Sequence, residues 1–387
     1  MDPVARKTLI DQKFNELYGA SPQLWARAPG RVDLMGSHTD YNLGYVMTMS
    51  IDRDTWIAAR PRPDGIVRIR SLNTPGEGIF DLGSITHASG RDWSEYVRGV
   101  AWALLQAGYM PAGLDGLVHS TVPFGSGLSS SAALEMAAGE IFMQAGGFEI
   151  GPLELALLGQ KAENQFVGMN CGILDQYSST MGQAGCALLL DCRALTSRLV
   201  SIAPGITVVV CNPKAGRDLV GSEYGERRSQ CEQGVRILQR FYPQIETLRD
   251  VTPAMLQAHA ADLPELVYKR CQFIVAENQR VLDLAEALPD ADKSRLGDLF
   301  AASYRGAVEL YEIGAPSMQA MISAMLAAPG VIAARQAGAG FGGCMVALVA
   351  QGQEDGFADR VAQIYTQQTG IQPEIYPIQA APGAGPL

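Results

Sequence analysis

Residues 123–133 read Pro123-Phe124-Gly125-Ser126-Gly127-Leu128-Ser129-Ser130-Ser131-Ala132-Ala133, and this stretch decides how the rest of the chain is interpreted. Its glycines allow the backbone to turn tightly and approach a ligand, and its serines and alanines begin a helix whose first amides point outward. A helix N-terminus of this kind attracts anions. Taken alone, the segment also fits an ordinary glycine-serine loop that caps a helix.

The same stretch lacks the lysine of a G-x-x-x-x-G-K-[ST] phosphate loop. A triphosphate bound here would depend on backbone amides, on the helix end and on Mg²⁺. A hydroxyl and a carboxylate should hold that ion, because Mg²⁺ prefers oxygen ligands. We predict that Ser131, or its neighbour Ser130, supplies the hydroxyl and that Glu163 supplies the carboxylate. Taken alone, Glu163 also fits a solvated helix residue.

The composition limits the class of protein. The chain has 387 residues, of which 47% are hydrophobic and 18% charged, so it can bury a large core. At ~150 residues per domain, two or three domains are predicted, and we expect two. The net charge of −10 and the lack of a basic stripe predict no nucleic-acid partner. Residues 1–7 have no apolar core after their basic residues, and no apolar run approaches ~20 residues, so we expect a cytoplasmic protein without a membrane partner. We also expect a monomer.

The cysteines and histidines form no disulfide framework or metal-binding pattern. No C-x-x-C pair occurs, and the histidines are not spaced as a metal-binding pair. We interpret the cysteines as reduced core residues. The cysteines stand at positions 171, 186, 192, 211, 231, 271 and 344, and the histidines at 38, 87, 119 and 259.

The pattern along the chain indicates a mixed α+β fold with two domains, 1–200 and 201–387. Short β-like runs mix with helical patterns in the first domain, and amphipathic stretches dominate the second. The boundary near residue 200 rests on this change of pattern, because no repeat or low-complexity linker separates the halves. Strands are predicted at 56–59, 66–70, 114–120 and 206–211, and helices at 131–144, 151–166, 221–242, 264–288, 292–311 and 317–327.

Residues 28–42 are unusually rich in polar side chains. They read Ala28-Pro29-Gly30-Arg31-Val32-Asp33-Leu34-Met35-Gly36-Ser37-His38-Thr39-Asp40-Tyr41-Asn42. Burying such a segment is costly unless a ligand completes its hydrogen bonds. A sugar-binding edge would explain the composition, since an aspartate can accept hydrogen bonds from two vicinal hydroxyls. A cluster of N-cap and turn residues is the alternative.

Asp175 is the one charged residue between Gln165 and Ala187. A carboxylate in apolar surroundings is either paired or functional, and we predict Arg31 as its partner. Phosphoryl transfer needs a carboxylate that orients or deprotonates the attacking hydroxyl, and it needs positive charge near the transferred group. Asp175 and Arg31 suit those two roles. A buried structural salt bridge is the alternative.

Taken together, these residues resemble the GHMP small-molecule kinases, and among them the galactokinase family, from about Trp25 to the C-terminus. Residues 30–42 resemble the family's sugar signature, residues 125–133 its ATP loop, and residues 336–344 its third motif. Residues 222–232 resemble a family helix whose tyrosine faces the sugar, and residues 191–193 resemble the end of a family strand. Trp93 and Tyr96 match a segment beside the adenine. Three motifs in order are specific, whereas one glycine-rich loop would be weak.

The resemblance implies a fold and a set of roles. It implies an N-terminal domain like domain 2 of ribosomal protein S5, a ferredoxin-like C-terminal domain, and an active site in the cleft. There ATP and Mg²⁺ would phosphorylate the anomeric hydroxyl of a sugar. The implied residues are Asp175 and Arg31 for catalysis; Ser37, His38, Asp40, Gly172 and Tyr224 for the sugar; Trp93, Gly125, Ser126, Gly127, Leu128, Ser129, Ser130 and Ser131 for ATP; and Ser131 and Glu163 for the metal.

Two positions depart from the family's pattern. Galactokinases carry glutamate where this chain has Ser37, and usually asparagine where it has Asp33. In the family that glutamate reaches the sugar's 6-hydroxyl, and a charged hydrogen bond of ~1.5–3 kcal/mol corresponds to roughly 10- to 150-fold in affinity. Galactose remains the expected substrate, because residues 38–42 have the full galactokinase form. L-Arabinose, which lacks C6, and galacturonate are alternatives, and the plant kinases for these sugars also lack the glutamate.

A non-catalytic sugar and ATP sensor is the alternative from another class, since galactokinase-like proteins serve as regulators in yeasts. Such a sensor resembles a galactokinase with a shortened ATP loop. Here residues 129–133 are uninterrupted, which favours the enzyme. The sugar signature likewise disfavours mevalonate or homoserine as the substrate.

Overall fold

Strands β1 (Leu24–Met35) and β2 (Tyr45–Arg62) each contribute residues to both structural units of the protein. The computed structural model describes residues 2–169, 171–215 and 220–387. One unit comprises Met1–Arg31, Ser50–Gln183 and Ala381–Leu387, and the other comprises Val32–Met49 and Ala184–Ala380. They differ from the expected domains 1–200 and 201–387, because β1 and β2 carry the chain out of the first unit and back into it.

The sheet of the first unit has the strand order β12-β1-β2-β5-β3-β4. The C-terminal β12 (Gly385–Pro386) pairs with β1, and β2 pairs antiparallel with β5 (Gly113–Ser120). β5 runs parallel to β3 (Ile66–Ser71), which pairs antiparallel with β4 (Glu77–Asp81). The C-terminus thereby covers an edge of the sheet that would otherwise be unpaired.

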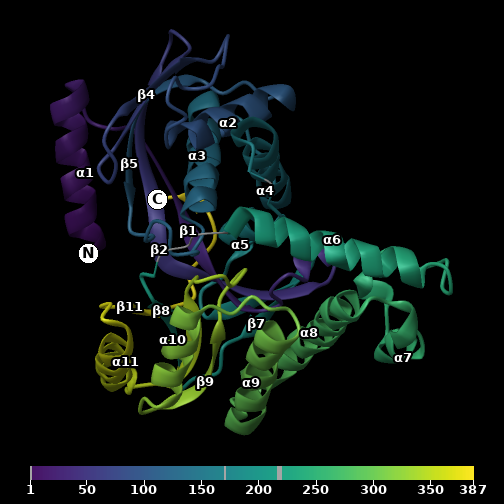
Figure 1. Ribbon diagram of the computed structural model, residues 1–387. Helices are drawn as coiled ribbons and strands as arrows, with labels where there is room; N and C mark the ends of the chain where they lie inside the picture. The colour runs from purple at the N-terminus through teal and green to yellow at the C-terminus, as the bar shows by residue number, and fades with distance from the viewer. Residues whose placement is uncertain (1, 170, 216–219) are drawn as a thin grey trace. The chain divides into compact units, whose positions relative to one another are not determined.

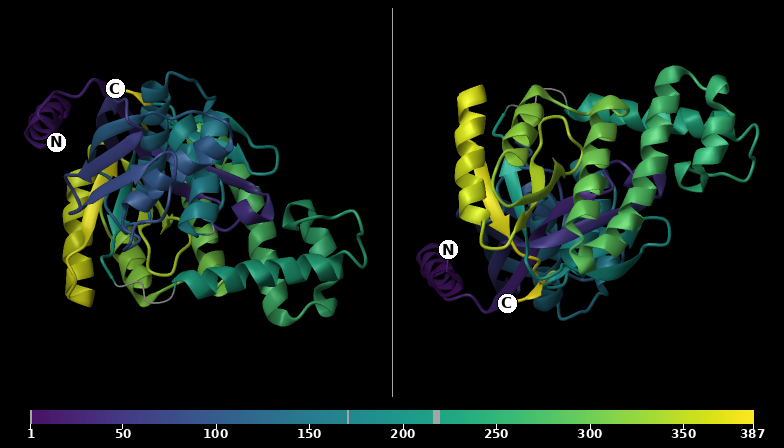
Figure 2. Two further views of the ribbon diagram at one scale, coloured as in Figure 1. Left: turned by 90° about the horizontal axis from the view of Figure 1, so that it is seen from above. Right: turned by 90° about the horizontal axis from the view of Figure 1, so that it is seen from below.

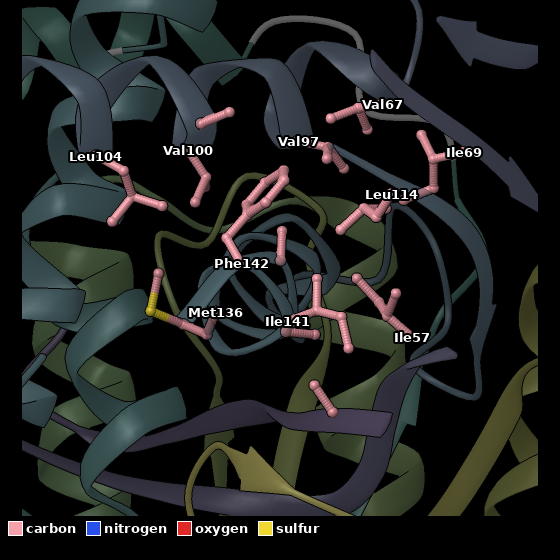
Figure 3. Packing of buried hydrophobic residues seen from close by; sticks show 14 of the residues in the cluster. Ile57, Val67, Ile69, Val97, Val100, Leu104, Leu114, Met136, Ile141 and Phe142 are labelled. Atoms are coloured by element: carbon pink, nitrogen blue, oxygen red, sulfur yellow. The ribbon is translucent and has the colours of Figure 1, made fainter. Parts of the chain in front are cut away.

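The two faces of this sheet are covered by different helices. Alternate residues of a strand point to opposite faces, so Ile57 of β2 joins one core and Trp56 joins the other. Ile57 packs with side chains of α2 (Ser94–Gln106) and α3 (Ser130–Gly146), among them Val97 and Phe142, as Figure 3 shows. Trp56 packs with α1 (Pro3–Tyr18), which begins at an Asp2 N-cap. The remaining helical segments of this unit are α4 (Pro152–Lys161), the π-helical turn η2 (Ala162–Val167) and α5 (Leu174–Met181).

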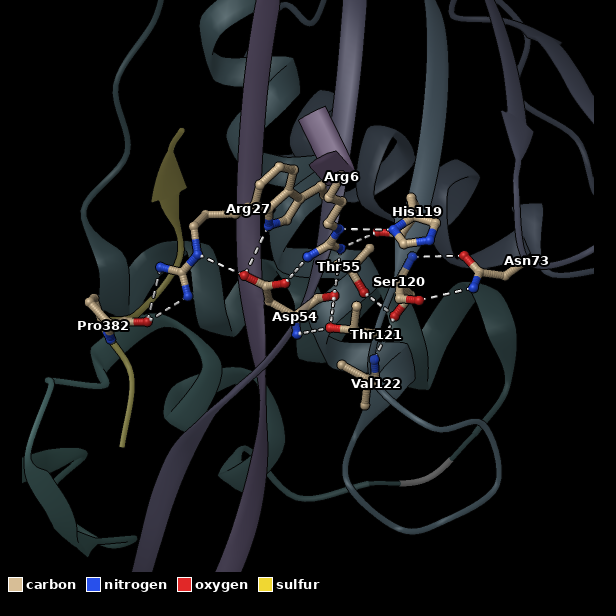
Figure 4. A network of polar contacts seen from close by, with 11 residues as sticks. Arg6, Arg27, Asp54, Thr55, Asn73, His119, Ser120, Thr121, Val122 and Pro382 are labelled. Atoms are coloured by element: carbon tan, nitrogen blue, oxygen red, sulfur yellow. Dashed lines mark hydrogen bonds and ion pairs between the residues drawn. The ribbon is translucent and has the colours of Figure 1, made fainter. Parts of the chain in front are cut away.

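A buried polar network ties α1 to the sheet (Figure 4). The guanidinium of Arg6 pairs with Asp54 and donates a hydrogen bond to Nδ1 of His119 at 2.8 Å. Asp54 also accepts from Arg27, whose guanidinium donates to the carbonyl of Pro382. Burial lowers the pKa values of Arg6 and His119. One carboxylate therefore links the N-terminal helix, and through Arg27 the C-terminal segment, to the same strands.

The second unit is built on an antiparallel sheet of order β11-β8-β10-β9. Its strands are β8 (Ile206–Asn212), β9 (Val331–Gln336), β10 (Met345–Ala350) and β11 (Glu374–Ile378). Helices α10 (Pro316–Leu326) and α11 (Glu354–Thr369) share a buried core with this sheet, and α11 lies beside β11 in Figure 2. Two further strands, β6 (Cys186–Asp191) and β7 (Thr196–Ser201), pair with the start of β2 and with each other.

A second core of this unit lies between helices. It joins side chains of α6 (Val220–Leu238), α7 (Pro253–Ala258) and α8 (Glu265–Asp290), and α9 (Lys293–Glu309) packs beside α8 in Figures 1 and 2. Short 3₁₀ turns lie at η1 (Asp40–Asn42), η3 (Leu248–Asp250) and η4 (Ala260–Asp262).

The predicted strands lie in β2, β3, β5 and β8, and the predicted helices correspond to α3, α4, α6, α8, α9 and α10. The helix predicted over 151–166 is regular only to Lys161, since its last turn is π-helical. All seven cysteines are free, and five of them are buried. Within the described residues, no helix is both long and apolar enough to cross a membrane.

Candidate active site

The glycine-rich loop between β5 and α3 has a strained backbone. Gly125 and Gly127 adopt positive φ angles of 67° and 83°, and Ser129 adopts a φ of 58°, which is uncommon for a residue with a side chain. Such strain persists where the surroundings enforce it, and it is concentrated at functional sites. Ser126 donates a hydrogen bond to the carbonyl of Pro123 at 2.7 Å, and Leu128 is buried. Ser130 and Ser131 then form the first turn of α3.

Gly30 allows this loop to lie directly against β1. A Cβ atom at Gly30 would lie 2.5 Å from the carbonyl oxygen of Leu128, which is closer than real Cβ contacts. The next amide, that of Arg31, donates a hydrogen bond to the same oxygen at 3.1 Å. The sugar signature and the predicted ATP loop are therefore joined through the backbone within one unit.

Asp175 lies in the first turn of α5, where Arg31 and Ser129 hold its carboxylate. Nε and Nη2 of Arg31 donate to Oδ1 at 2.8 and 2.6 Å, and the hydroxyl of Ser129 donates to Oδ2 at 2.5 Å. The third nitrogen of Arg31 donates to the carbonyl of Gly127 at 2.7 Å. The predicted Arg31–Asp175 pair is thus present. About a quarter of the Asp175 side chain, 26%, is exposed, so both oxygens are held while the group stays accessible.

Glu163 is buried in the π-helical turn and accepts several hydrogen bonds. Gln176 donates to its Oε2 at 2.6 Å, the thiol of Cys171 donates at 3.1 Å, and the Ser131 hydroxyl also contacts the carboxylate. Burial and the charge of Asp175 raise the pKa of Glu163, although these donors oppose the rise. Gly172 lies close by in sequence, in the segment before α5.

The predicted metal ligands, Ser131 and Glu163, are in contact with each other at the N-terminus of α3. No cluster of three or more His, Cys, Asp or Glu side chains suited to a metal occurs among the described residues. One hydroxyl and one carboxylate still fit Mg²⁺, because this ion keeps several waters and binds substrate phosphates as well. The donor set therefore agrees with the predicted ion.

Trp93 lies at the N-cap of α2 and lines a small cavity with Phe124 and Ser130. The cavity measures about 40 Å³, which is room for about one water. The buried indole Nε1 of Trp93 has no hydrogen-bond partner in the part of the chain that the structure describes. The indole of Trp93 therefore lies beside the first turn of α3 with a buried donor that no described residue uses.

In the second unit, His38 connects the sugar signature to the third motif. Its Nε2 lies 3.0 Å from the carbonyl oxygen of Ala339, which can only accept, so Nε2 carries the hydrogen. Burial lowers the pKa of His38 to about 4, so the ring is neutral near pH 7. Nδ1 therefore accepts from the hydroxyl of Tyr41 at 3.0 Å, and Tyr41 in turn lies 2.7 Å from the hydroxyl of Tyr311. These bonds define the tautomer of His38.

Some of the remaining sugar-signature residues form the turn, and others are partly exposed. Thr39 and Asn42 bond to backbone atoms of their own turn, as the turn-cluster interpretation expects. Asp40 begins η1 and is partly exposed. Tyr224 of α6 lies beside His38, with ring centroids 5.3 Å apart. Asp40 and Tyr224 are therefore partly exposed, whereas His38 is buried and both of its ring nitrogens are already hydrogen-bonded.

Ser37 lies in a buried ionic network that sequence reasoning missed. Its hydroxyl donates to Asp33 at 3.3 Å and accepts from Nη2 of Arg335 at 2.9 Å. Arg335 also contacts Glu277 at 3.3 Å. Burial opposes ionisation of Glu277, yet the charges of Arg280 and Arg335 lower its pKa below the usual value. A lone arginine in the apolar strand β9 was the signal that could have indicated this network.

Three family models match parts of the chain. The model for the galactokinase galactose-binding signature matches residues 12–61, that for the GHMP kinases N terminal domain matches 95–183, and that for the GHMP kinases C terminal domain matches 284–367. Mevalonate kinase from Methanococcus jannaschii shares the fold, with a TM-score of 0.66 at 16% identity over 93% of this chain and 99% of that one. The fold is therefore that of a two-domain GHMP kinase.

Galactokinases are much more similar. A galactokinase from Roseiflexus sp. (strain RS-1) is 43% identical over 97% of this chain and 96% of its own length, and one from Chloroflexus aurantiacus is 42% identical over 96% and 95%. The crystal structure of Lactococcus lactis galactokinase complexed with galactose matches with a TM-score of 0.92 at 33% identity, covering 98% of this chain and 99% of that one. The chain belongs to the galactokinase family of the GHMP kinases.

Proposed function

We propose that the protein is an ATP-dependent galactokinase, which converts D-galactose and ATP into α-D-galactose 1-phosphate and ADP. The observation that carries this proposal is the carboxylate of Asp175, held by Arg31 and Ser129 beside the glycine-rich loop. The family membership and the galactose bound to the Lactococcus lactis relative support the choice of sugar. We also propose that the enzyme is cytoplasmic and that it acts as a monomer.

Asp175 is the proposed base. An ionised carboxylate with both oxygens held by donors can accept the proton of the anomeric hydroxyl, or orient that hydroxyl, as its oxygen bonds to the γ-phosphorus of ATP. The bond from that phosphorus to the bridging oxygen breaks, and ADP leaves. Arg31 holds the base and also binds the carbonyl of Gly127. The same side chain thus fixes the base relative to the ATP loop.

We assign the ligand contacts by the same reasoning. His38, Asp40, Gly172 and Tyr224 would bind the sugar, and the loop 125–131 would bind the phosphates with its amides. Trp93 would lie beside the adenine, and its place in a cavity with Ser130, at the first turn of α3, supports that assignment. Ser131 and Glu163 would hold Mg²⁺, which when bound neutralises charge on the phosphate oxygens.

L-Arabinose is the second candidate substrate, and Ser37 is the observation that favours it. The hydroxyl of Ser37 is already bonded to Arg335 and Asp33, so it offers no carboxylate to a 6-hydroxyl. Galacturonate is the third candidate substrate. A glutamate at position 37, as in galactokinases, would repel its C6 carboxylate, and Ser37 does not.

The test is phosphate transfer to galactose, L-arabinose and galacturonate by the purified protein, with kcat/KM compared among the three. We expect the highest value for galactose. A higher value for L-arabinose would replace the substrate and keep the class of enzyme. No transfer to any of the three sugars would contradict the proposal.

A further inference from the structure

Three buried side chains from three elements meet at the predicted metal ligand Glu163. Glu135 comes from α3, Glu163 from the turn η2 and Gln176 from α5. Glu135 and Gln176 are 0% exposed, and Glu163 is 7% exposed. The side-chain amide nitrogen of Gln176 donates to Oε2 of Glu135 at 2.8 Å and to Oε2 of Glu163 at 2.6 Å. One NH₂ group has two hydrogens, so each acid receives one of them.

The two acids differ in the number of their hydrogen-bond donors. Among the described residues, Glu163 accepts from Gln176, Cys171 and Ser131, whereas Glu135 accepts only from Gln176. The other carboxyl oxygen of Glu135, Oε1, is buried without a partner among the same residues. Gln176 is therefore the one described donor to Glu135, and it joins this acid to the better satisfied Glu163.

This arrangement restricts the orientation of the Gln176 amide. With Nε2 placed between the two acids, both receive a hydrogen bond, and the amide oxygen of Gln176 is buried with no partner among the described residues. A flip of the amide would break both of these hydrogen bonds. Gln176 also follows Asp175 directly on α5, so the same helical turn carries the proposed base and this amide.

We propose that Gln176, clamped by Glu135, is a positioning residue that fixes the Glu163 carboxylate against Ser131. Groups that bond to metal ligands in this way orient them, and their loss typically lowers metal affinity by about 10- to 100-fold. The inference rests on the proposed function, because it concerns the metal site of that reaction. It assigns roles to two fully buried residues, Glu135 and Gln176, that the proposed function does not otherwise use.

The experiment uses four variants of the full chain. Glu135→Leu keeps the approximate volume but removes the acceptor, and Gln176→Met removes the donor. Glu135→Gln keeps an acceptor oxygen for Gln176 and is the rescue variant. Glu140→Leu is the matched control, because Glu140 lies on the same helix and its pKa is raised by burial alone.

The first measurement is the melting temperature with saturating ATP and MgCl₂, compared with the melting temperature with saturating ATP and EDTA. The difference is the rise that MgCl₂ adds. We expect this added rise to be lost in Glu135→Leu and Gln176→Met and to persist in Glu135→Gln and Glu140→Leu. The second is the Mg²⁺ concentration that gives half-maximal transfer to galactose. It should increase about 10-fold or more in the first two variants, with the KM for galactose unchanged.

Wild-type Mg²⁺ dependence in a folded Glu135→Leu or Gln176→Met protein would overturn the inference. A Glu135→Gln protein whose Mg²⁺ dependence is as impaired as that of Glu135→Leu would also overturn it. That result would mean that the acid is needed and that an acceptor oxygen for Gln176 is not enough. If Glu135→Leu fails to fold, the comparison of Gln176→Met with Glu135→Gln decides. The melting temperatures test the positioning role of Gln176 and Glu135 without any sugar. The transfer assay tests the proposed function, so the two can fail separately.

Discussion

The hydroxyl of Ser37 donates a hydrogen bond to the carboxylate of Asp33, 3.3 Å away, and both side chains are almost fully buried. These are the two positions where the chain departs from the galactokinase pattern of asparagine and glutamate. In this chain the carboxylate of the pair stands at residue 33, and Arg335 bonds to Ser37 and contacts Glu277. We therefore expect the two departures to be energetically coupled.

We predict that Ser37→Glu alone destabilises the protein, because it adds a second carboxylate beside Asp33 in a buried network. The expected loss is about 3 kcal/mol in the free energy of unfolding. Asp33→Asn combined with Ser37→Glu should recover most of it, since the network then holds as many carboxylates as in the wild type, one at residue 37 and one at Glu277. Urea denaturation of the two single variants and the double variant gives the coupling energy. Strictly additive effects would show that the two positions are independent.

The same double variant tests substrate preference. Restoring glutamate at residue 37 should raise the kcat/KM ratio of galactose over L-arabinose by roughly 10- to 150-fold, the range of a charged hydrogen bond to the 6-hydroxyl. Steady-state kinetics with both sugars measures the ratio, and Asp33→Asn alone is the control. An unchanged ratio in a stable double variant would mean that residue 37 points away from C6.

Gly30→Ala should weaken ATP binding. The added Cβ would lie 2.5 Å from the carbonyl of Leu128, so the ATP loop must move away from β1. We expect the KM for ATP to rise about 10-fold or more, because small displacements in an active site are costly. Gly90→Ala is the matched control, since a Cβ there meets nothing within 4 Å. Equal ATP kinetics in the two variants would refute this account of the loop.

His38 should make stability depend on pH between about 6.5 and 4. Burial lowers its pKa in the folded protein to about 4, against 6.5 when unfolded, so the unfolded chain binds more protons in that window. The stabilisation is complete above pH 6.5 and is lost as the pH falls toward 4, by about 3 kcal/mol. We expect the free energy of unfolding, measured by urea denaturation at each pH, to change less with pH in His38→Gln than in the wild type. The control is His87→Gln, whose side chain is 43% exposed. Identical slopes for wild type and His38→Gln would contradict the assignment.

The sequence could predict what depends on local pattern. The glycine-rich loop and the helix that follows it could be inferred from their residue pattern. The partnership of Arg31 with Asp175 could be inferred because an isolated charge in an apolar stretch needs a partner. The roles of these residues remain predictions.

Other contacts between distant segments could not be predicted. Arg335 bonds to Ser37 and contacts Glu277. Glu277 looks ordinary in its helix, and a lone arginine in an apolar strand signals a partner without saying which segment supplies it. The periodicity of residues 151–166 predicted a regular helix, whereas the π-helical turn at its end presents Glu163 to Gln176. The division of β1 and β2 between the two units was likewise hidden, because a long strand carries no boundary signal.

The most direct test of the central claim is a ³¹P NMR time course of the purified protein with ATP, Mg²⁺ and galactose, run beside Asp175→Asn. We predict that the wild type forms galactose 1-phosphate and ADP in equal amounts. The variant should form no detectable product and yet still gain thermal stability from ATP. Galactose 1-phosphate produced at the wild-type rate by Asp175→Asn would remove Asp175 from its role, and a wild type that forms none would contradict the account.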